Sequence, residues 1–219
     1  MLSIGNAQNS KKTSPKKATK ELPLEPKRNV SFTTDKGTWI SLDVSPDGKT
    51  IVFDLMGDVY SLPIAGGKAT RVTKGLAYDV HPRYSPDGKS IVFISDKSGS
   101  DNIWTMNLET KKQKQISKEK KHNFFSAEWT NDGDYIVGGK GRRNIKFKIY
   151  HKEGGSGSQL FGEPKGLKVI DPAFGADGKL LYFSQRNGAW NYNAQLPQYQ
   201  IMTFDRNDGS TETITSKYG

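Results

Sequence analysis

Residues 85–89 read Ser-Pro-Asp-Gly-Lys; they follow Tyr84 and precede the apolar run Ile-Val-Phe-Ile at 91–94. Proline presets the backbone at the second position of a tight turn, aspartate tolerates the third, and glycine takes the left-handed conformation that closes the turn. The segments on either side of such a turn run antiparallel. The motif therefore predicts a β-hairpin.

This turn motif occurs four times, and its other copies begin at Ser45, Thr130 and Gly175. The aspartates of successive copies are 40, 45 and 45 residues apart. A period in this range indicates stacked structural units.

The residues around each turn have the pattern of β-strands. A large or β-branched apolar residue lies three residues before each aspartate, and isoleucine or leucine lies four residues after it. This alternation has the period of a strand with one buried face. Each unit then offers two more strand-like runs, and four short strands per repeat are typical of a propeller blade. We therefore predict an all-β fold, a β-propeller of four-stranded antiparallel blades.

The predicted strands follow the repeat. They are 38–44, 50–55, 58–63 and 69–72 in blade one; 80–84, 90–95, 102–108 and 113–116 in blade two; 125–129, 135–139, 145–151 and 158–161 in blade three; and 169–174, 180–184, 199–205 and 211–214 in blade four. A further short strand is expected at 30–34, where it could complete the last blade of a closed ring.

Residues 1–29 differ in composition from the rest, because Ser, Lys, Pro and Asn dominate and aromatic residues are missing. They are predicted to form a disordered basic tail. Seven Lys and Arg against two Glu give the tail +5 of the formal net charge of +10. The folded part is only moderately basic, which favours a solvated linker over a nucleic-acid-binding segment. Residues 1–8 are similar to the end of a secretory signal peptide, with an ordinary cytoplasmic N-terminus as the alternative.

The number of repeats indicates whether the blades form a complete propeller ring. Propellers have about four to eight blades, and terminal repeats are usually atypical and polar, which the fourth repeat here is not. We expect residues 30–216 to form blades one to four of an incomplete ring, with 217–219 starting a further connection. A complete four-bladed ring is the alternative.

The repeats resemble those of TolB and of tricorn-type proteases. The resemblance covers residues 30–216 and is most specific at 45–60 and 85–104, where an apolar residue and Ser-Pro-Asp-Gly-Lys are followed by Asp-Val-Tyr or Asn-Ile-Trp. It is looser in the last two repeats, where Asn131 and Ala176 replace the proline. More narrowly, 37–48 with 54–60 is similar to the N-terminal propeller of large bacterial exported amidohydrolases. That resemblance implies a propeller followed by a metal-dependent hydrolase barrel. Residues 1–219 contain no part of that barrel.

The sequence offers no catalytic or metal-binding motif. Its three histidines, His81, His122 and His151, lie far apart without a His-x-His or His-Glu-x-x-His spacing, and cysteine is absent. A hydrolytic zinc site needs about three protein ligands, and a nucleophile elbow or phosphate loop is also missing. We therefore predict no catalytic residues, metal ligands or cofactor in this segment. The oxygen-rich residues 96–102 fit a blade turn, with a calcium loop as the alternative.

Function should then come from a surface. In a propeller the Asp-Gly turns share one rim, and the loops between second and third strands share the opposite face with the connections between blades. The basic and aromatic side chains expected there define a candidate binding face: Lys140, Arg142, Arg143, Arg186, Trp190 and Tyr192. The last two belong to a long insertion at 185–198, and exposed aromatics beside arginine favour binding. Packing of this loop against a neighbouring domain is the alternative.

Two functions remain open. The first is a non-catalytic N-terminal module that gates substrates, such as small peptides or amides, for a metal-dependent amidohydrolase domain in the same parent chain. The second is a stand-alone TolB-like scaffold that binds proteins. Both imply a periplasmic or secreted location without membrane insertion, and binding of single-stranded nucleic acid is the weakest hypothesis.

Overall fold

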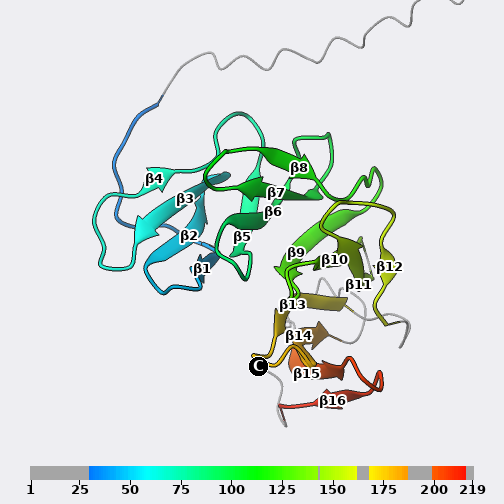
Figure 1. Ribbon diagram of the computed structural model, residues 1–219. Helices are drawn as coiled ribbons and strands as arrows, with labels where there is room; N and C mark the ends of the chain where they lie inside the picture. Colours follow the sequence, from blue (N-terminus) through cyan, green and yellow to red (C-terminus); the bar gives the residue numbers. More distant parts are fainter. Residues whose placement is uncertain (1–29, 143, 162–167, 187–198, 216–219) are drawn as a thin grey trace, which may run out of the picture. The chain divides into compact units, whose positions relative to one another are not determined.

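The computed structural model describes residues 30–142, 144–161, 168–186 and 199–215. The chain divides into two units, residues 1–33 and 34–219, and every strand belongs to the second (Figure 1). Within the described ranges all regular structure is β, which confirms the predicted all-β class. No helix in this part of the chain is long and apolar enough to cross a membrane.

Blades one and two are separate antiparallel sheets, each with its strands in sequence order. Blade one contains β1 (Leu42–Val44), β2 (Thr50–Leu55), β3 (Asp58–Pro63) and β4 (Thr70–Arg71). Blade two contains β5 (Asp79–Tyr84), β6 (Ser90–Ser95), β7 (Asn102–Asn107) and β8 (Gln113–Gln115).

Blades three and four repeat this order and are joined by one parallel bridge between Ile145 and Lys168. Blade three contains β9 (Asn123–Trp129), β10 (Tyr135–Gly141), β11 (Ile145–His151) and β12 (Ser158–Gln159). Blade four contains β13 (Lys168–Phe174), β14 (Leu180–Arg186), β15 (Gln200–Asp205) and β16 (Thr211–Thr213).

The largest differences from the predicted strands lie before and in blade one. The strand predicted at 30–34 is wrong, because these residues have no strand assignment. The first strand of blade one begins at Leu42 rather than residue 38, since Trp39 takes a left-handed backbone (φ 58°) that cannot continue a strand. The fourth strand of each blade is also shorter than predicted.

The turn motif is closed by side-chain hydrogen bonds as well as by its backbone. In blade two the Gly88 N–H donates to the Ser85 carbonyl at 2.8 Å, and Gly88 is left-handed (φ 68°). The Ser85 hydroxyl donates to Asp87 Oδ1 at 2.6 Å and accepts the Ser90 N–H at 2.9 Å, while Lys89 N–H donates to the same Asp87 oxygen at 3.0 Å. One hydroxyl therefore links the aspartate to the first residue of the next strand.

The first and third turns make the same set of bonds, with Ser45 and Thr130 supplying the hydroxyl. The hydrogen bond from this hydroxyl is the largest cause that lowers the pKa of Asp47, Asp87 and Asp132. These carboxylates accordingly stay ionised in their turns.

Successive turns lie against one another, which confirms that they share one rim. A Cβ on Gly88 would lie 3.5 Å from Cδ of Pro46, and one on Gly133 would lie 3.6 Å from Cδ of Pro86. In the last pair Asn131 replaces proline, and its side-chain amide donates to the carbonyl of Gly175 at 3.0 Å. The loss of proline is thus compensated by a hydrogen bond between blades three and four.

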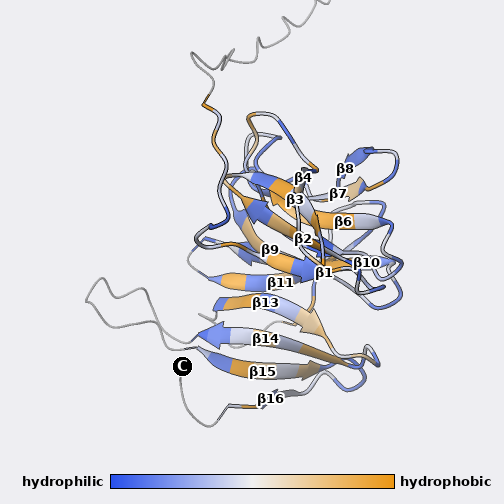
Figure 2. Ribbon diagram, turned by 90° about the vertical axis from the view of Figure 1, so that its left-hand side faces the viewer, coloured by the Kyte–Doolittle hydropathy of each residue, from blue (hydrophilic) through white to orange (hydrophobic). Residues whose placement is uncertain are grey.

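The core consists of three apolar clusters, one at each interface between successive blades. Alternating apolar side chains of the strands supply them (Figure 2). They contain Val52, Val59, Tyr84, Ile91, Phe93 and Met106 between blades one and two; Val92, Ile94, Ile103, Ile116, Phe124, Ala127, Trp129, Ile136 and Tyr150 between blades two and three; and Val137, Phe147, Val169, Leu181, Phe183, Met202 and Phe204 between blades three and four. Full burial of such a side chain contributes about 1.5–3 kcal/mol, so face-to-face packing of blades is the main stabilising interaction.

The fourth turn lacks the hydroxyl, because Gly175 occupies its position. We expect Gly175→Ser to stabilise the chain by about 1 kcal/mol, through the restored hydrogen bond and a less flexible unfolded state. The site has room, since an added Cβ would lie 3.6 Å from Asp177 Oδ1 and 3.4 Å from the Tyr182 ring. Urea unfolding measures the change. The matched reverse variant, Ser85→Gly, should lose about 1–2 kcal/mol; a destabilised Gly175→Ser would contradict this account of the turn.

Candidate functional site

The first strands of the four blades, β1, β5, β9 and β13, converge on a pocket of about 270 Å³ at the rim of the turns. Residues of all four strands and of three turns line it: Asp43, Val44, Pro46, Tyr84, Ser85, Pro86, Glu128, Trp129, Asn131, Ala173 and Phe174. We call it the axial pocket.

Two charged side chains that line the axial pocket, those of Asp43 and Glu128, occupy the same position of the repeat, four residues before each motif aspartate. This position holds Asp43, Arg83, Glu128 and Ala173 in the four blades. It precedes the apolar residue that packs between blades, and successive strand residues point to opposite faces. The repeat therefore directs these charges away from the apolar clusters.

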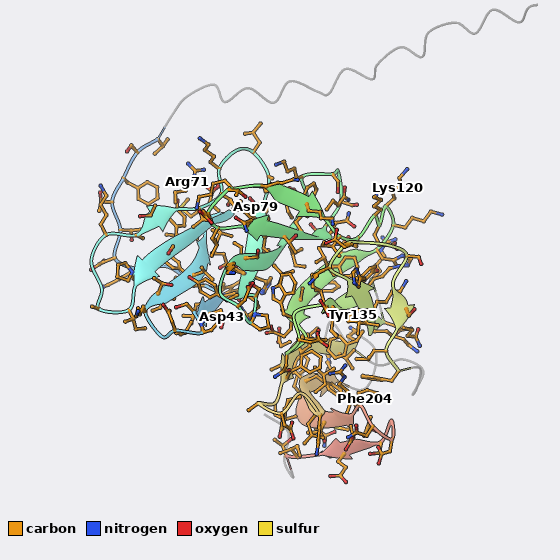
Figure 3. The ribbon with its side chains drawn as sticks, viewed as in Figure 1. Asp43, Arg71, Asp79, Lys120, Tyr135 and Phe204 are labelled. Carbon is orange, nitrogen blue, oxygen red and sulfur yellow. The ribbon has the colours of Figure 1, made fainter. Side chains whose placement is uncertain are left out.

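Hydrogen bonds and an ion pair connect the charged residues of neighbouring blades. Asp43 Oδ2 accepts the Tyr84 N–H at 2.8 Å, and Arg83 Nε lies 3.7 Å from Glu128 Oε2. Arg83 Nη1 also donates to Ser41 Oγ at 3.0 Å, which holds the guanidinium between blades one and three. Figure 3 labels Asp43 on the first strand of this series.

Glu128 has an unusual environment for a carboxylate. Burial raises its pKa to about 7, although the Trp129 N–H donates to Oε1 at 2.8 Å and the Arg83 guanidinium favours the charged form. Asp43 adds to the increase through charge repulsion. Glu128 therefore exchanges a proton near neutral pH, so the charge of the pocket changes in that range.

A second row of residues, six before each motif aspartate, contains two strained positions. His81 and Asp171 both take a left-handed backbone (φ 55° and 54°) immediately before a proline, where the ladder is irregular. The His81 N–H donates to Asp54 Oδ2 at 2.7 Å and the Asp171 N–H to Ser126 Oγ at 3.0 Å, so the preceding blade supplies each acceptor. Burial lowers the pKa of His81, with the Asp54 and Asp171 carboxylates opposing the shift. His81 is thus neutral at pH 7.

A separate polar cluster lies between blades one and two and combines the buried Asp58 and Asp79 with the half-exposed Arg71. Arg71 pairs with Asp58, and burial raises the pKa of Asp79, which also accepts hydrogen bonds from Ser95 and Thr73 (Figure 3 labels Arg71 and Asp79). A larger groove of about 580 Å³ lies between the same two blades. Its lining comes from two blades only, whereas residues of all four blades line the axial pocket.

The axial pocket offers polar groups that can bind a ligand. The described residues contain no group of three or more His, Cys, Asp or Glu side chains that could hold a metal ion. Residues 96–102 form a turn in which the Asn102 side chain bonds to Ser98, Ser100, Ser117 and Glu119, so its oxygen and nitrogen are already engaged. The carboxylates of Asp43 and Glu128, with the aromatic rings of the lining, can bind a polar or positively charged group.

The candidate binding face is described only in part. Lys140, at the end of β10, pairs with Glu119, which also lies 3.5 Å from His122. Arg142 is exposed and Arg186 is largely buried. Arg143, Trp190 and Tyr192 lie outside the described residues. Use of this face in binding stays a prediction.

Comparison with known proteins places these features in a family. The profile of the TolB beta propeller domain matches residues 12–196. The chain belongs to the TolB beta propeller family. The Tol-Pal system protein TolB of Francisella tularensis subsp. mediasiatica is 32% identical over 180 residues, which cover 78% of this chain and 39% of that protein. The chain thus spans about two-fifths of the length of the curated relatives it matches.

Solved TolB and hydrolase structures share the fold. TolB from Acinetobacter baumannii has a TM-score of 0.64 at 24% identity, covering 80% of this chain and 43% of that one. A putative TolB from Agrobacterium tumefaciens gives 0.62 at 17% identity, covering 80% and 79%. A puromycin hydrolase gives 0.61 at 15% identity, covering 84% and 30%. These similarities confirm the TolB-type propeller at the level of the fold.

The charges of the axial pocket were not predicted from the sequence of this TolB-type chain. A signal was present, because Asp43, Arg83 and Glu128 occupy one repeat position that alternates with the buried apolar one. A comparison of the four repeats in register would have identified it. The pKa of Glu128 depends on contacts between blades, which no single repeat contains.

The raised pKa of Glu128 makes stability depend on pH. Between about 4.5 and about 7 the folded chain binds more protons at this site than the unfolded chain, so stability falls as the pH rises through this range. We expect Glu128→Gln to be about 2 kcal/mol more stable than the parent at pH 8 and to show little difference at pH 4.5, allowing for partial solvent screening. Urea unfolding at both pH values measures this.

The matched control for this prediction is Glu109→Gln, which changes an exposed glutamate. The stability of Glu109→Gln should equal that of the parent at both pH values. Equal stability of Glu128→Gln and the parent at pH 8 would contradict the raised pKa.

Proposed function

We propose that this chain is a non-catalytic recognition module that binds a protein partner at the axial pocket. The observation that carries the proposal is that carboxylates from two blades, Asp43 and Glu128, line one pocket, while the Arg83 guanidinium of the blade between them lies 3.7 Å from Glu128. Convergent polar groups in a concave site fix the orientation of a ligand, and the surrounding surface adds affinity.

A polypeptide segment fits the chemistry of the axial pocket. The volume of about 270 Å³ accommodates one or two side chains rather than a large cofactor. Tyr84, Trp129 and Phe174 line it beside the charges, and aromatic residues with arginine commonly dominate the energy of protein interfaces. Two carboxylates beside one guanidinium favour a segment with a basic or amide side chain.

The cellular setting of the proposal follows from the relatives. They are named as proteins of the Tol-Pal system. We propose a periplasmic or secreted location for this chain as well, and a protein of that system as its partner.

A second proposal concerns a larger parent. The segment Gly37–Gly48 with Asp54–Tyr60 is similar to the propellers of exported amidohydrolases, and an axial pocket could admit small peptides or amides to a hydrolase domain. In that case the chain gates substrates for a partner domain in the same polypeptide. Sequencing of the gene beyond the codon for Gly219 tests this, since a metal-dependent hydrolase domain is expected there and a stop codon would exclude it.

The recognition proposal is tested by calorimetric titration with purified Pal, the protein for which the Tol-Pal system of the Francisella tularensis relatives is named. We expect the parent chain to bind and Arg83→Ala to bind at least about tenfold more weakly, which corresponds to about 1.4 kcal/mol. The physical reason is that the substitution removes the guanidinium and leaves the Glu128 carboxylate without its charge partner.

The control variant is Lys120→Ala, which changes an exposed lysine in the connection before blade three. Unchanged affinity of Lys120→Ala supports binding at the axial pocket. Weaker binding by Lys120→Ala but not by Arg83→Ala would instead place the partner at the connection before blade three. If Pal does not bind the parent chain, the proposal that the partner is a protein of the Tol-Pal system is wrong.

A further inference from the structure

The groove of about 580 Å³ between blades one and two lies between two sheet faces that the chain turns toward each other. Strand pairing in blade one places Val52, Ser61 and Thr70 in one row across β2, β3 and β4. Val52 is fully buried in the apolar cluster with blade two. Because the residues of a row share one face of the sheet, Ser61 and Thr70 present hydroxyls on the same face, and both line the groove. We call it the inter-blade groove.

The next interface, between blades two and three, is closed where this groove is open. The same row of blade two consists of Val92, Thr105 and Lys114, and Lys114 pairs with Glu153 of blade three. This ion pair bridges the outer strands of the two blades. Threonine at position 70 cannot form such a pair, so the outer end of the first interface lacks this closure.

The turn between the third and fourth strands adds to the difference. In blade three this turn contains Gly154, where an added Cβ would lie 3.4 Å from the carbonyl oxygen of Ile116 in blade two. Strand register gives Thr110 the equivalent position in blade two, four residues after Met106 as Gly154 is four after Tyr150. A threonine side chain keeps the turn from packing on the preceding blade as closely as glycine does. The inter-blade groove thus results from particular substitutions in the repeat.

The charges that line the inter-blade groove are balanced. Asp47 and Asp87 of the first two turns contribute two carboxylates, and Arg71 and Lys111 contribute two cations. Hydrogen bonds within the turns lower the pKa of both aspartates, so all four groups are charged at neutral pH. A ligand with a net charge of either sign would therefore meet repulsion from one of the two pairs.

Atoms of both signs are available to a ligand. In the second turn Asp87 Oδ1 accepts the Ser85 hydroxyl and the Lys89 N–H, which leaves Oδ2 to accept a further hydrogen bond. Arg71 uses Nε for the Thr73 carbonyl at 3.1 Å and Nη2 for Asp58, which leaves Nη1 as a donor. The inter-blade groove therefore offers strong acceptors and strong donors to the same ligand.

Hydroxyls and apolar side chains complete the lining. The hydroxyls of Thr50 and Tyr84 lie 2.9 Å apart and connect the two blades, and Val72 and Leu108 add apolar surface. A ligand hydroxyl both donates and accepts, so a neutral ligand with several hydroxyls can bond to carboxylates, cations and hydroxyls together. The C–H groups of a sugar ring can in addition contact the apolar side chains.

We propose that the inter-blade groove binds a neutral saccharide chain. Its volume lies within the range of about 300–1,000 Å³ of ligand pockets and accommodates about two sugar rings. The proposal goes beyond recognition of a protein at the axial pocket and does not depend on it, although Pro46 and Tyr84 line both sites.

The proposal is tested by NMR titration of the isotopically labelled chain with three neutral trisaccharides: chitotriose, cellotriose and maltotriose. At least one should shift the backbone amide signals of Ser61, Thr70 and Lys111 in a saturable manner. If none of the three shifts these signals, or if the shifts lie only outside the inter-blade groove, the proposal is wrong.

A substitution that copies the closed interface provides the matched test. Thr70→Lys places a lysine at the position of Lys114, and Glu109 of blade two occupies the position of Glu153, three residues after Met106. The added side chain should fill the groove and weaken saccharide binding at least about tenfold. The control, Ser158→Lys, makes the same change at the equivalent exposed position of blade three and should bind like the parent. Unchanged binding by Thr70→Lys would overturn the proposal.

Charged and peptide probes test the class of ligand. Trigalacturonic acid and the deacetylated glucosamine trimer should each bind more weakly than the best neutral trisaccharide, because one pair of charges repels each of them. A capped serine tetrapeptide, which carries hydroxyls on a peptide backbone, should not shift the groove signals. Tighter binding of a charged trimer, or binding of the peptide alone, would overturn the assignment to a neutral saccharide.

Discussion

The tight Asp-Gly turn, closed in all four blades by a hydrogen bond from the glycine N–H to the carbonyl three residues earlier, is the constraint on which the rest of this structure depends. It fixes the hairpin between the first and second strands of a blade, and the second strand carries the apolar residues that pack between blades. Because glycine in one turn lies against proline in the preceding one, the same motif also sets the spacing of successive blades. A local bond thus determines a long-range arrangement.

The axial pocket is a consequence of that arrangement. Alternation along the first strand places an apolar residue between blades and its neighbour toward the axis. Asp43, Arg83 and Glu128 meet because three consecutive blades repeat this geometry, and burial then raises the pKa of Glu128. On each first strand, one residue therefore packs between blades and the residue before it contributes to the site.

Local patterns predicted most of the fold. The bounds of β2, β3, β6 and β11 agree with the prediction, because turn chemistry and alternating apolar residues act within a few residues of each other. The strand expected at 30–34 failed, since a strand also needs a partner that its own sequence does not specify. The left-handed His81 could not be predicted either, because its backbone N–H bonds to Asp54 on the preceding blade. For the site, the repeat positions of the charges were readable in the sequence, but their contacts and pKa values depend on the packing of blades.

The chain belongs to the TolB beta propeller family, and its proposed function depends on a largely buried carboxylate, Glu128, that exchanges a proton near neutral pH. The most direct measurement of that claim is an NMR titration of the Glu128 side-chain carboxyl carbon in the uniformly labelled chain, assigned with Glu128→Gln. We expect the Glu128 carboxyl to titrate with a midpoint at about pH 7. A midpoint near 4.5, the ordinary value for glutamate, would show a solvated side chain and contradict the axial pocket.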